Sequence, residues 1–234
     1  MKERPIIFNA EMVRAVLSGN KTQTRRIVNP QPELTKGSGF SWNGALYGAG
    51  SDERETNRNF AHVKCPHGKL GDRLWVRETF QGPLIPEEEL SEFVGASNPD
   101  RFESPAYCEY AADGGPRPEY VDADDNIRHG WRAAIHMPRW ASRITLEITG
   151  VRVERLNDIS EQDARAEGVG RLRGGFWRHY QPGWTQHQLS ARGSFVTLWK
   201  SIYGDESWQA NPWVWVIEFK RIKADTNLET GGEA

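Results

Sequence analysis

Two long stretches of the sequence, at about residues 29–70 and 81–130, show no sustained hydrophobic period, so the core must come from the remaining segments. The first is rich in Pro, Gly, Ser and Asn, and the second is acidic and rich in proline. Stretches of this length and composition are typical of surface excursions. We therefore predict one domain over residues 1–222 with these two insertions, followed by a flexible tail over residues 223–234.

The segments around the first insertion carry one helix pattern and one strand pattern. A helix is predicted over residues 10–18, because Asn9 is a good N-cap and Gly19 a suitable C-terminal stop. Its apolar face is formed by Met12, Val13, Val16 and Leu17. A strand is predicted after the turn at Gly71-Asp72, since Leu74 and Val76 alternate with more polar positions.

The C-terminal part of the chain carries the strongest periodic patterns. Ile144, Leu146 and Ile148 alternate, and Thr149-Gly150 is a turn or a bulge before a second run at Val151 and Val153. Two helices are predicted, a short one from Ser160 to Gly168 and a longer one through Phe195 to Gly204. A closing strand is predicted over residues 213–222, where apolar side chains alternate with less apolar ones.

The composition favours a sheet structure over a helical bundle. The chain contains 10 Trp, 23 Gly and 13 Pro among 234 residues, which is typical of small aromatic-rich barrels or sandwiches with long polar loops. Together with the periodic segments, this predicts a mixed α+β fold. We expect a small β-barrel of about five or six strands with two or three flanking helices.

Charge and hydropathy exclude several classes of protein. The 30 basic and 32 acidic side chains exclude a strongly basic nucleic-acid-binding protein, and two cysteines, Cys65 and Cys108, exclude a disulfide scaffold. No run approaches the roughly 18 apolar residues of a membrane helix, and the segment Met1–Pro5 lacks the apolar character of a signal peptide. We therefore expect a cytoplasmic protein with no membrane partner.

The segment from Lys21 to Arg26 is the densest cluster of reactive and charged groups, with an amine, two threonine hydroxyls and two guanidiniums within six residues. Cationic neighbours or partial burial lower the pKa of a lysine, and only the neutral amine can take a proton from a threonine hydroxyl. The segment therefore allows a Lys/Thr nucleophile pair. The alternative is a solvated basic turn at a helix C-terminus, which the helix dipole also favours.

The sequence of this segment, Gly19-Asn20-Lys21-Thr22-Gln23-Thr24-Arg25-Arg26, resembles the G-x-K-T-x-T-x-R signature of the ASCH domain family of PUA-like β-barrels. Further pieces match in the family's order: the turn and strand at 71–76, the short acidic helix at 159–168 and the closing strand at 216–220. The family includes small bacterial N4-acetylcytidine amidohydrolases, and the chain also resembles larger phage and prophage ASCH-like proteins, including over residues 136–143. The matching pieces cover less than half of the chain.

The resemblance implies a catalytic set and a mechanism. The family's lysine, threonine and glutamate fall on Lys21, Thr24 and Glu167, with Glu161 or Glu78 as alternatives for the glutamate. Lys21 is then the general base, Thr24 Oγ1 attacks the acyl carbonyl of an N-acylated nucleobase, and Glu167 positions the amine or moves a proton to the leaving nitrogen.

A nucleoside substrate also needs an aromatic surface for stacking and polar contacts. The sequence offers Trp75, Phe80, Trp177 and Tyr180 as aromatic candidates, and we expect Trp75, Phe80 and Glu78 to contact the substrate. Most tryptophans in such a chain are core residues instead. Arg25 and Arg26 are the candidates for a phosphate contact if the ligand is a nucleotide or RNA, or else they pair with surface acids.

The segment His62-Val63-Lys64-Cys65-Pro66-His67 is the one candidate for a metal site, since it has three ligand types at close spacing. A structural zinc normally has four ligands, and Cys108, His129 or His136 would have to supply the fourth from a distant segment. A simple loop turn is the favoured interpretation. We expect no metal and no cofactor.

The sequence thus predicts hydrolysis of an N4-acylated cytidine or a related modified nucleoside or nucleotide. A non-catalytic module that binds RNA or a modified base is the alternative from another class, because PUA-like barrels commonly have that role. A ribonuclease that uses the same basic cleft is a third, weaker alternative. The lysine beside a threonine favours the hydrolase.

Overall fold

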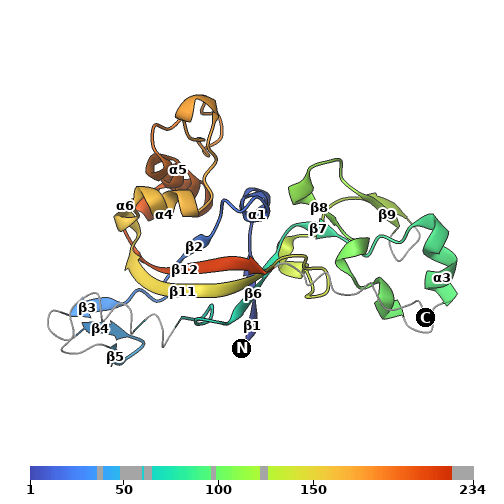
Figure 1. Cartoon of the computed structure of the whole chain (residues 1–234), viewed down its shortest axis with the longest axis horizontal. Helices are drawn as coiled ribbons and strands as arrows, with labels where there is room; N and C mark the ends of the chain where they lie inside the picture. The colour runs from blue at the N-terminus through green and yellow to red at the C-terminus, as the bar shows by residue number, and fades with distance from the viewer. Residues whose placement is uncertain (36–38, 48–59, 61–64, 96–98, 122–125, 223–234) are drawn as a thin grey trace, which may run out of the picture.

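The computed structural model describes residues 1–234 except 36–38, 48–59, 61–64, 96–98, 122–125 and 223–234. Within these residues, the strands of the central sheet number five and lie in the order β1-β6-β11-β12-β2. The first pair is parallel and the other pairs are antiparallel (Figure 1). The strands are β1 (Glu3–Ile7), β6 (Arg73–Arg77), β11 (Thr145–Arg155), β12 (Trp213–Ile222) and β2 (Gln23–Ile27).

The predicted mixed α+β fold is confirmed, but the closed β-barrel is wrong. The two edge strands, β1 and β2, do not pair with each other among the described residues, so the sheet stays open. Side chains instead of backbone hydrogen bonds bridge the two edges. The guanidinium of Arg26 on β2 donates to the carbonyl oxygen of Ile7 on β1 at 2.7 Å, and it lies 5.7 Å from the ring of Phe8.

Strand β11 is one continuous strand with a bulge, which decides between the two predictions for Thr149-Gly150. Its register against β12 shifts between Ile148 and Gly150. A side chain on Gly150 would collide with the carboxylate of Glu218 on β12, because a Cβ there would lie 2.6 Å from Glu218 Oε2. A bulge of this kind bends the strand and increases its local twist.

Helices pack on both faces of the sheet. The predicted helix after Asn9 is α1 (Ala10–Leu17), and the Asn9 side chain accepts a hydrogen bond from the Met12 amide. The two predicted C-terminal helices are α4 (Glu161–Ala166), capped by Ser160, and α5 (Ala191–Tyr203), capped by Ser190. The sequence patterns missed α6 (Asp205–Gln209).

The core has two main parts, one on each face of the sheet. One contains α1 and the inward side chains of β6, β11 and β12, among them Val13, Leu74 and Ile217. The other lies between the sheet and helices α4 and α5, around Val216, Phe195 and Leu198. Strand β12 is therefore buried on both faces along most of its length, as expected for a strand with helices or chain on both sides.

The first predicted insertion contains a small antiparallel sheet that is anchored to the core. Its strands are β3 (Glu33–Thr35), β4 (Gly39–Trp42) and β5 (Ala45–Tyr47). Phe40 is fully buried, with its ring edge against Trp213 of β12 at 4.8 Å between centroids. Trp42 and Tyr47 also pack on the core, whereas Leu46 is exposed.

The second insertion forms an elongated lobe at the opposite end of the sheet from the first insertion (Figure 1). It contains only short elements: β7 (Phe80–Gln81), α3 (Leu90–Gly95), β8 (Glu109–Tyr110), β9 (Glu119–Val121) and β10 (Ile127–His129), with single 3-10 turns between them. Tyr110 of this insertion forms a small core with three residues that flank it in sequence, Phe80, Met137 and Ala141. The predicted flexible tail at 223–234 lies outside the described residues.

Among the described helices, none combines the length and the apolar character that crossing a membrane requires.

Candidate active site

The chain reverses sharply after α1 and brings Lys21 against the end of α4. Gly19 has φ +77° and ends the helix, and the amide of Lys21 then donates to the carbonyl of Ala15 at 2.9 Å. Lys21 and Glu167 form an isolated antiparallel bridge. Gly168 is required at this crossing, because a Cβ at that position would lie 2.7 Å from the Cβ of Lys21.

The side chain of Lys21 is fully buried and bound to Glu167. Its Nζ donates to Oε2 of Glu167 at 2.8 Å and to the backbone carbonyl of Glu167 at 2.9 Å. Nζ also lies 5.5 Å from the centroid of the Phe8 ring. Burial lowers the pKa of the Lys21 amine below that of a free lysine, and the charge and hydrogen bond of Glu167 oppose this only in part. The amine can therefore lose its proton more readily than an exposed lysine.

Glu167 is shared between Lys21 and Arg25. Its second carboxylate oxygen, Oε1, accepts a hydrogen bond from Nη1 of Arg25 at 3.0 Å. The carboxylate is 3% exposed, so both of its oxygens are fixed by buried cations. This leaves the glutamate with a single orientation, in which Oε2 faces the lysine.

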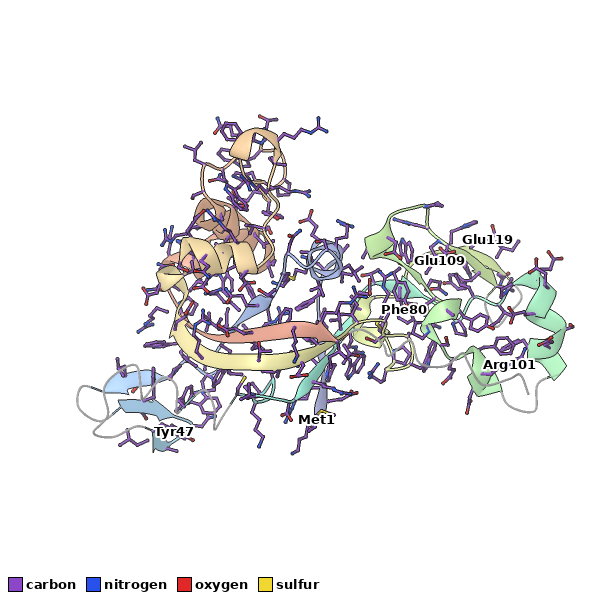
Figure 2. All side chains as sticks on the ribbon, viewed as in Figure 1. Met1, Tyr47, Phe80, Arg101, Glu109 and Glu119 are labelled. Carbon is purple, nitrogen blue, oxygen red and sulfur yellow. The ribbon has the colours of Figure 1, made fainter. Side chains whose placement is uncertain are left out.

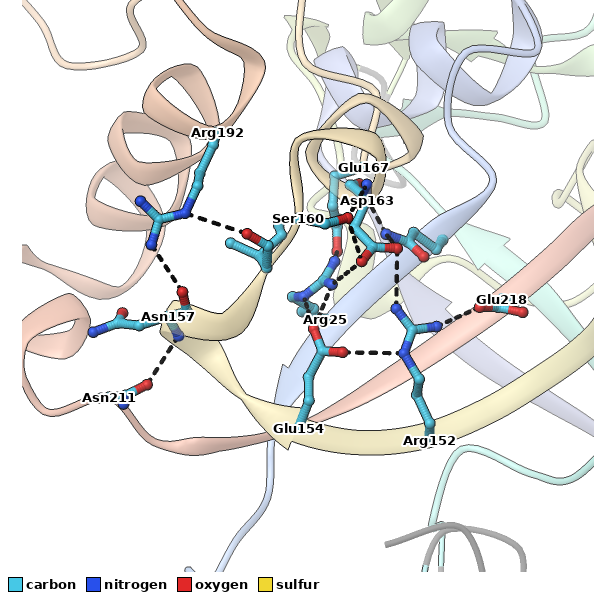
Figure 3. Close-up of polar contacts among 12 residues, drawn as sticks. Arg25, Arg152, Glu154, Asn157, Ser160, Asp163, Glu167, Arg192, Asn211 and Glu218 are labelled. Carbon is cyan, nitrogen blue, oxygen red and sulfur yellow. Dashed lines mark hydrogen bonds and ion pairs between the residues drawn. The ribbon is translucent and has the colours of Figure 1, made fainter. Parts of the chain in front are cut away.

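Arg25 belongs to a network of charges between β2, β11 and α4 (Figure 3). Besides Glu167, it binds Glu154 and lies 3.6 Å from a carboxylate oxygen of Asp163. Arg152 extends the network by contacting Glu154, Asp163 and Glu218. The predicted phosphate contact of Arg25 is therefore replaced by carboxylates, and its side chain is fully buried.

Thr24 lies on β2, and its side chain is buried with no hydrogen bond to its hydroxyl among the described residues. The residue is 1% exposed. It lines a small cavity of about 10 Å³ together with Arg26, Glu167 and Met12. No hydrogen bond joins Thr24 to Lys21 in the described part of the chain, but Glu167 borders on both. Because no hydrogen bond within the described residues uses this hydroxyl and Thr24 lines the cavity, the hydroxyl is available to a ligand there.

A larger cleft of about 430 Å³ adjoins this small cavity. Both are lined by Met12, Arg26 and Ile202, and the larger one is also lined by His67 and the end of β1. A volume of this size is within the range of small-molecule sites. Met12 and Ile202 therefore separate an open cleft from the hydroxyl of Thr24.

Two of the aromatic residues that we expected to contact the substrate lie elsewhere. Trp75 lies on β6 beneath the guanidiniums of Arg77 and Arg139, 5.5 and 5.9 Å from its ring. Phe80 is fully buried in the core of the second insertion (Figure 2). Neither shares a hydrogen bond with Lys21, Thr24 or Glu167 among the described residues. The structure therefore does not bring either ring to the Lys21 group, and the periodicity of a strand does not show which of its faces meets a site.

Glu78 is also occupied by another contact. Both of its oxygens bind Arg143 at 3.0 Å, and the same guanidinium binds Asp113. Burial raises the pKa of Glu78, and the bonds to Arg143 oppose this. Glu78 therefore holds the second insertion against the sheet, and the structure places it neither as a substrate contact of the Lys21 group nor as the alternative partner of Lys21.

Glu161, the other alternative to Glu167, caps a helix. Its two oxygens accept hydrogen bonds from the amides of Ala191 and Arg192 at the start of α5, at 2.8 and 2.9 Å. Among the three glutamates considered, Glu167 is the one that contacts Lys21. The sequence reasoning missed the charges of β11, although the run Arg152-Val153-Glu154 on a predicted strand places both charges on one face.

The candidate metal loop lies partly outside the described residues, which exclude His62. Within the described part of the chain, no three His, Cys, Asp or Glu side chains are arranged to hold a metal ion. Burial raises the pKa of the Cys65 thiol to about 11. Burial, with the charges of Arg26 and Arg4, lowers the pKa of His67 to about 4. His67 is thus neutral at pH 7 and lines the cleft beside Arg26.

Comparison of the chain with protein-family models, with curated proteins and with solved structures found no match. The resemblance to the ASCH family therefore rests on the motifs quoted above, and the activity that it implies stays a prediction.

Proposed function

We propose that the chain is an amidohydrolase that removes the acyl group of an N4-acylated cytidine or a related modified nucleoside, on an open PUA-like fold of the ASCH type. The observation that supports this most is the pairing of a fully buried Lys21 of lowered pKa with Glu167, next to the unpartnered hydroxyl of Thr24. In a solvated surface turn, the Lys21 amine would lie in water, with neither a buried carboxylate partner nor a pKa lowered by burial.

In the proposed reaction, the substrate enters the cleft lined by Met12, Arg26 and Ile202. The neutral amine of Lys21 takes the proton of the Thr24 hydroxyl, and Oγ1 attacks the acyl carbonyl carbon. Arg26, which lines the same cavity as Thr24, is the proposed donor to the resulting oxyanion. The geometry needs a small movement of the lysine toward Thr24 when substrate displaces its contact with Glu167.

The remaining steps return the enzyme to its starting state. The tetrahedral intermediate collapses with cleavage of the C–N bond, and the Lys21 ammonium supplies the proton that the leaving exocyclic nitrogen takes up. The acyl group stays on Thr24 as an ester. A water molecule, deprotonated by Lys21, then hydrolyses this ester and releases the carboxylic acid. The resulting Lys21 ammonium protonates Oγ1 of Thr24 as the ester is cleaved, and the lysine then returns to its contact with Glu167.

The direct test is incubation of the purified protein with N4-acetylcytidine and chromatographic detection of cytidine and acetate. Thr24→Val removes the hydroxyl and keeps the shape, and we expect it to lower kcat by at least about a hundredfold. Thr22→Val is the matched control, because Thr22 is exposed and its contact to α4 uses only its backbone amide. Lys21→Met should be as inactive as Thr24→Val.

Two results would contradict the proposal. One is turnover by Thr24→Val at the wild-type rate, which would exclude this hydroxyl as the nucleophile. The other is the absence of turnover with any N4-acylated cytidine, whether free, phosphorylated or in RNA. If the protein then still binds RNA, the non-catalytic binding module is the better interpretation.

A further inference from the structure

The indole N–H of Trp199 on α5 is buried and has no hydrogen-bond partner within the described residues. A buried indole usually donates to a partner, because burial without one costs free energy. The lack of a partner does not by itself define a site, since the buried indole N–H of Trp213 shares this feature. What distinguishes the two tryptophans is where each of them lies.

Trp199 lines the same small cavity as Thr24, whereas Trp213 does not. Trp213 belongs to the part of the core on the opposite face of the sheet. The cavity of about 10 Å³ therefore has two polar groups without partners in its lining, the Thr24 hydroxyl and the Trp199 N–H. Its volume has room for about one water-sized group, such as the oxygen atom of a ligand.

The position of the Trp199 ring is fixed by its neighbours on α5. Its centroid lies 4.3 Å from that of Tyr203 and 6.0 Å from that of Phe195. The three residues are four positions apart, so they share one face of the helix, and all three line the cavity. A donor held in this way needs no reorganisation when charge develops on a bound ligand.

Helix α5 is in turn joined to the helix that carries Glu167. Glu161 at the start of α4 accepts hydrogen bonds from the first two amides of α5, at 2.8 and 2.9 Å. Glu167 is the C-cap of the same short helix. The contact between the helices therefore holds Trp199 at a defined place relative to the pair of Lys21 and Glu167.

The proposed reaction has a use for such a donor. Attack on the acyl carbonyl turns its oxygen into an oxyanion, which fixed N–H groups stabilise. An indole N–H donates one hydrogen bond and accepts none, so it suits an oxygen that carries negative charge. We propose that the N–H of Trp199 donates to the acyl carbonyl oxygen of the substrate and, beside Arg26, stabilises the oxyanion that forms when Thr24 attacks. This inference rests on the proposed hydrolase function.

The first test compares two variants that each lose a buried, unpartnered indole N–H and keep an aromatic ring. Trp199→Phe should lower kcat for N4-acetylcytidine by about tenfold or more, because an oxyanion donor acts mainly in the transition state. KM should change by less than about twofold for the same reason. Trp213→Phe is the matched control and should keep the wild-type kcat, since Trp213 lies on the opposite face of the sheet.

The second test needs neither turnover nor a folded Trp199→Phe variant. The ¹⁵N-labelled Thr24→Val variant is titrated with N4-acetylcytidine, and the assigned indole ¹H–¹⁵N signals are followed by NMR spectroscopy. The Trp199 indole proton should move downfield as the acyl carbonyl accepts its hydrogen bond. The Trp213 signal should stay in place.

The inference is overturned if Trp199→Phe keeps the wild-type kcat, if Trp213→Phe loses as much activity, or if saturating N4-acetylcytidine leaves the Trp199 signal unmoved. Turnover that does not depend on Trp199 would overturn the inference and leave the hydrolase standing. If the wild type turns over no acylated cytidine, the hydrolase and the oxyanion both fail. The indole signal then decides whether Trp199 binds the carbonyl: a downfield shift supports this contact, and its absence overturns it.

Discussion

Lys21 and Glu167 are 146 positions apart in sequence, yet Nζ of the lysine lies 2.8 Å from Oε2 of the glutamate, with the lysine fully buried. A buried ion pair of this kind seldom adds stability, because the loss of hydration offsets most of the attraction. Its presence next to an unpartnered threonine hydroxyl therefore favours a chemical role. The same carboxylate also binds Arg25, so the pair is one end of a larger network.

Thr24 and Thr197 allow a direct comparison of a free and a bonded hydroxyl. We expect Thr24→Val to change the free energy of unfolding by less than about 1 kcal/mol, because its hydroxyl has no partner among the described residues and the new methyl group fits a buried site. Thr197→Val should cost about 1–3 kcal/mol, since it leaves the amide of Tyr180 and the carbonyl of Ser194 without their bonds. Urea unfolding of both variants at pH 7 measures the difference. Equal losses would mean that Thr24 has a structural partner.

In the proposed reaction Lys21 is the general base, so the pH dependence of that reaction should report on its titration. The base must be neutral, so kcat/KM should rise with pH through the lowered pKa of Lys21 and reach its plateau below the ordinary lysine range. The charge of Glu167 raises this pKa, and the charge of Arg26 lowers it. Glu167→Gln should therefore move the rising limb to lower pH, and Arg26→Gln should move it to higher pH. Both variants will have reduced rates, but the midpoints are measured independently of the rate.

Shifts in the same direction for both variants, or no shift, would contradict Lys21 as the titrating base. Lys21→Met is the necessary companion variant, because the pH profile of any residual activity in it should lack the rising limb.

The guanidinium of Arg25 is the shared counter-charge of three carboxylates. Its replacement by Met should cost about 3–5 kcal/mol, since Glu154, Asp163 and Glu167 would lose a buried counter-charge. Arg178→Met is the control, because its pair with Glu11 is largely exposed and should be worth less than about 1 kcal/mol. Thermal or urea unfolding of the two variants gives the comparison. A small loss for Arg25→Met would show that the network is not coupled to folding.

Much of the central sheet could be predicted from the sequence because its strands have a clear period. The strand at 213–222, the helices after Asn9 and Ser160, and the helix that ends at Gly204 follow from alternation, helical spacing and caps. Closure of the sheet could not be predicted, because it depends on whether the two edge strands meet through their backbones or through side chains. Here Arg26 and Phe8 lie between them.

The candidate site could be predicted only in part. The contact of Lys21 with Glu167 agrees with the positions that the ASCH resemblance implies, whereas their catalytic roles stay a prediction. The contacts of Arg25, Glu78 and Trp75 could not be predicted, because each of these side chains contacts residues of a distant segment. Periodicity assigns a side chain to a face, but the long-range packing decides which charges meet there.

The last prediction concerns His67, which lines the cleft beside Arg26. Burial first, and then the charges of Arg26 and Arg4, lower its pKa from 6.5 to about 4 in the folded chain. Between these two values the unfolded chain binds a proton that the folded chain does not, so the stability contributed by neutral His67 is complete above about pH 6.5 and is lost as the pH falls toward 4. The full loss is at most about 3.5 kcal/mol, at about 1.4 kcal/mol for each pH unit. We expect His67→Gln to be less sensitive to acid, so that its unfolding free energy falls less than that of the wild type between pH 7 and pH 4.5. His187→Gln, which replaces an exposed histidine, should behave like the wild type in the same urea titrations. If His67→Gln and the wild type lose the same stability over this range, His67 does not titrate as its surroundings require, and the cleft beside Thr24 is more open to water than the structure indicates.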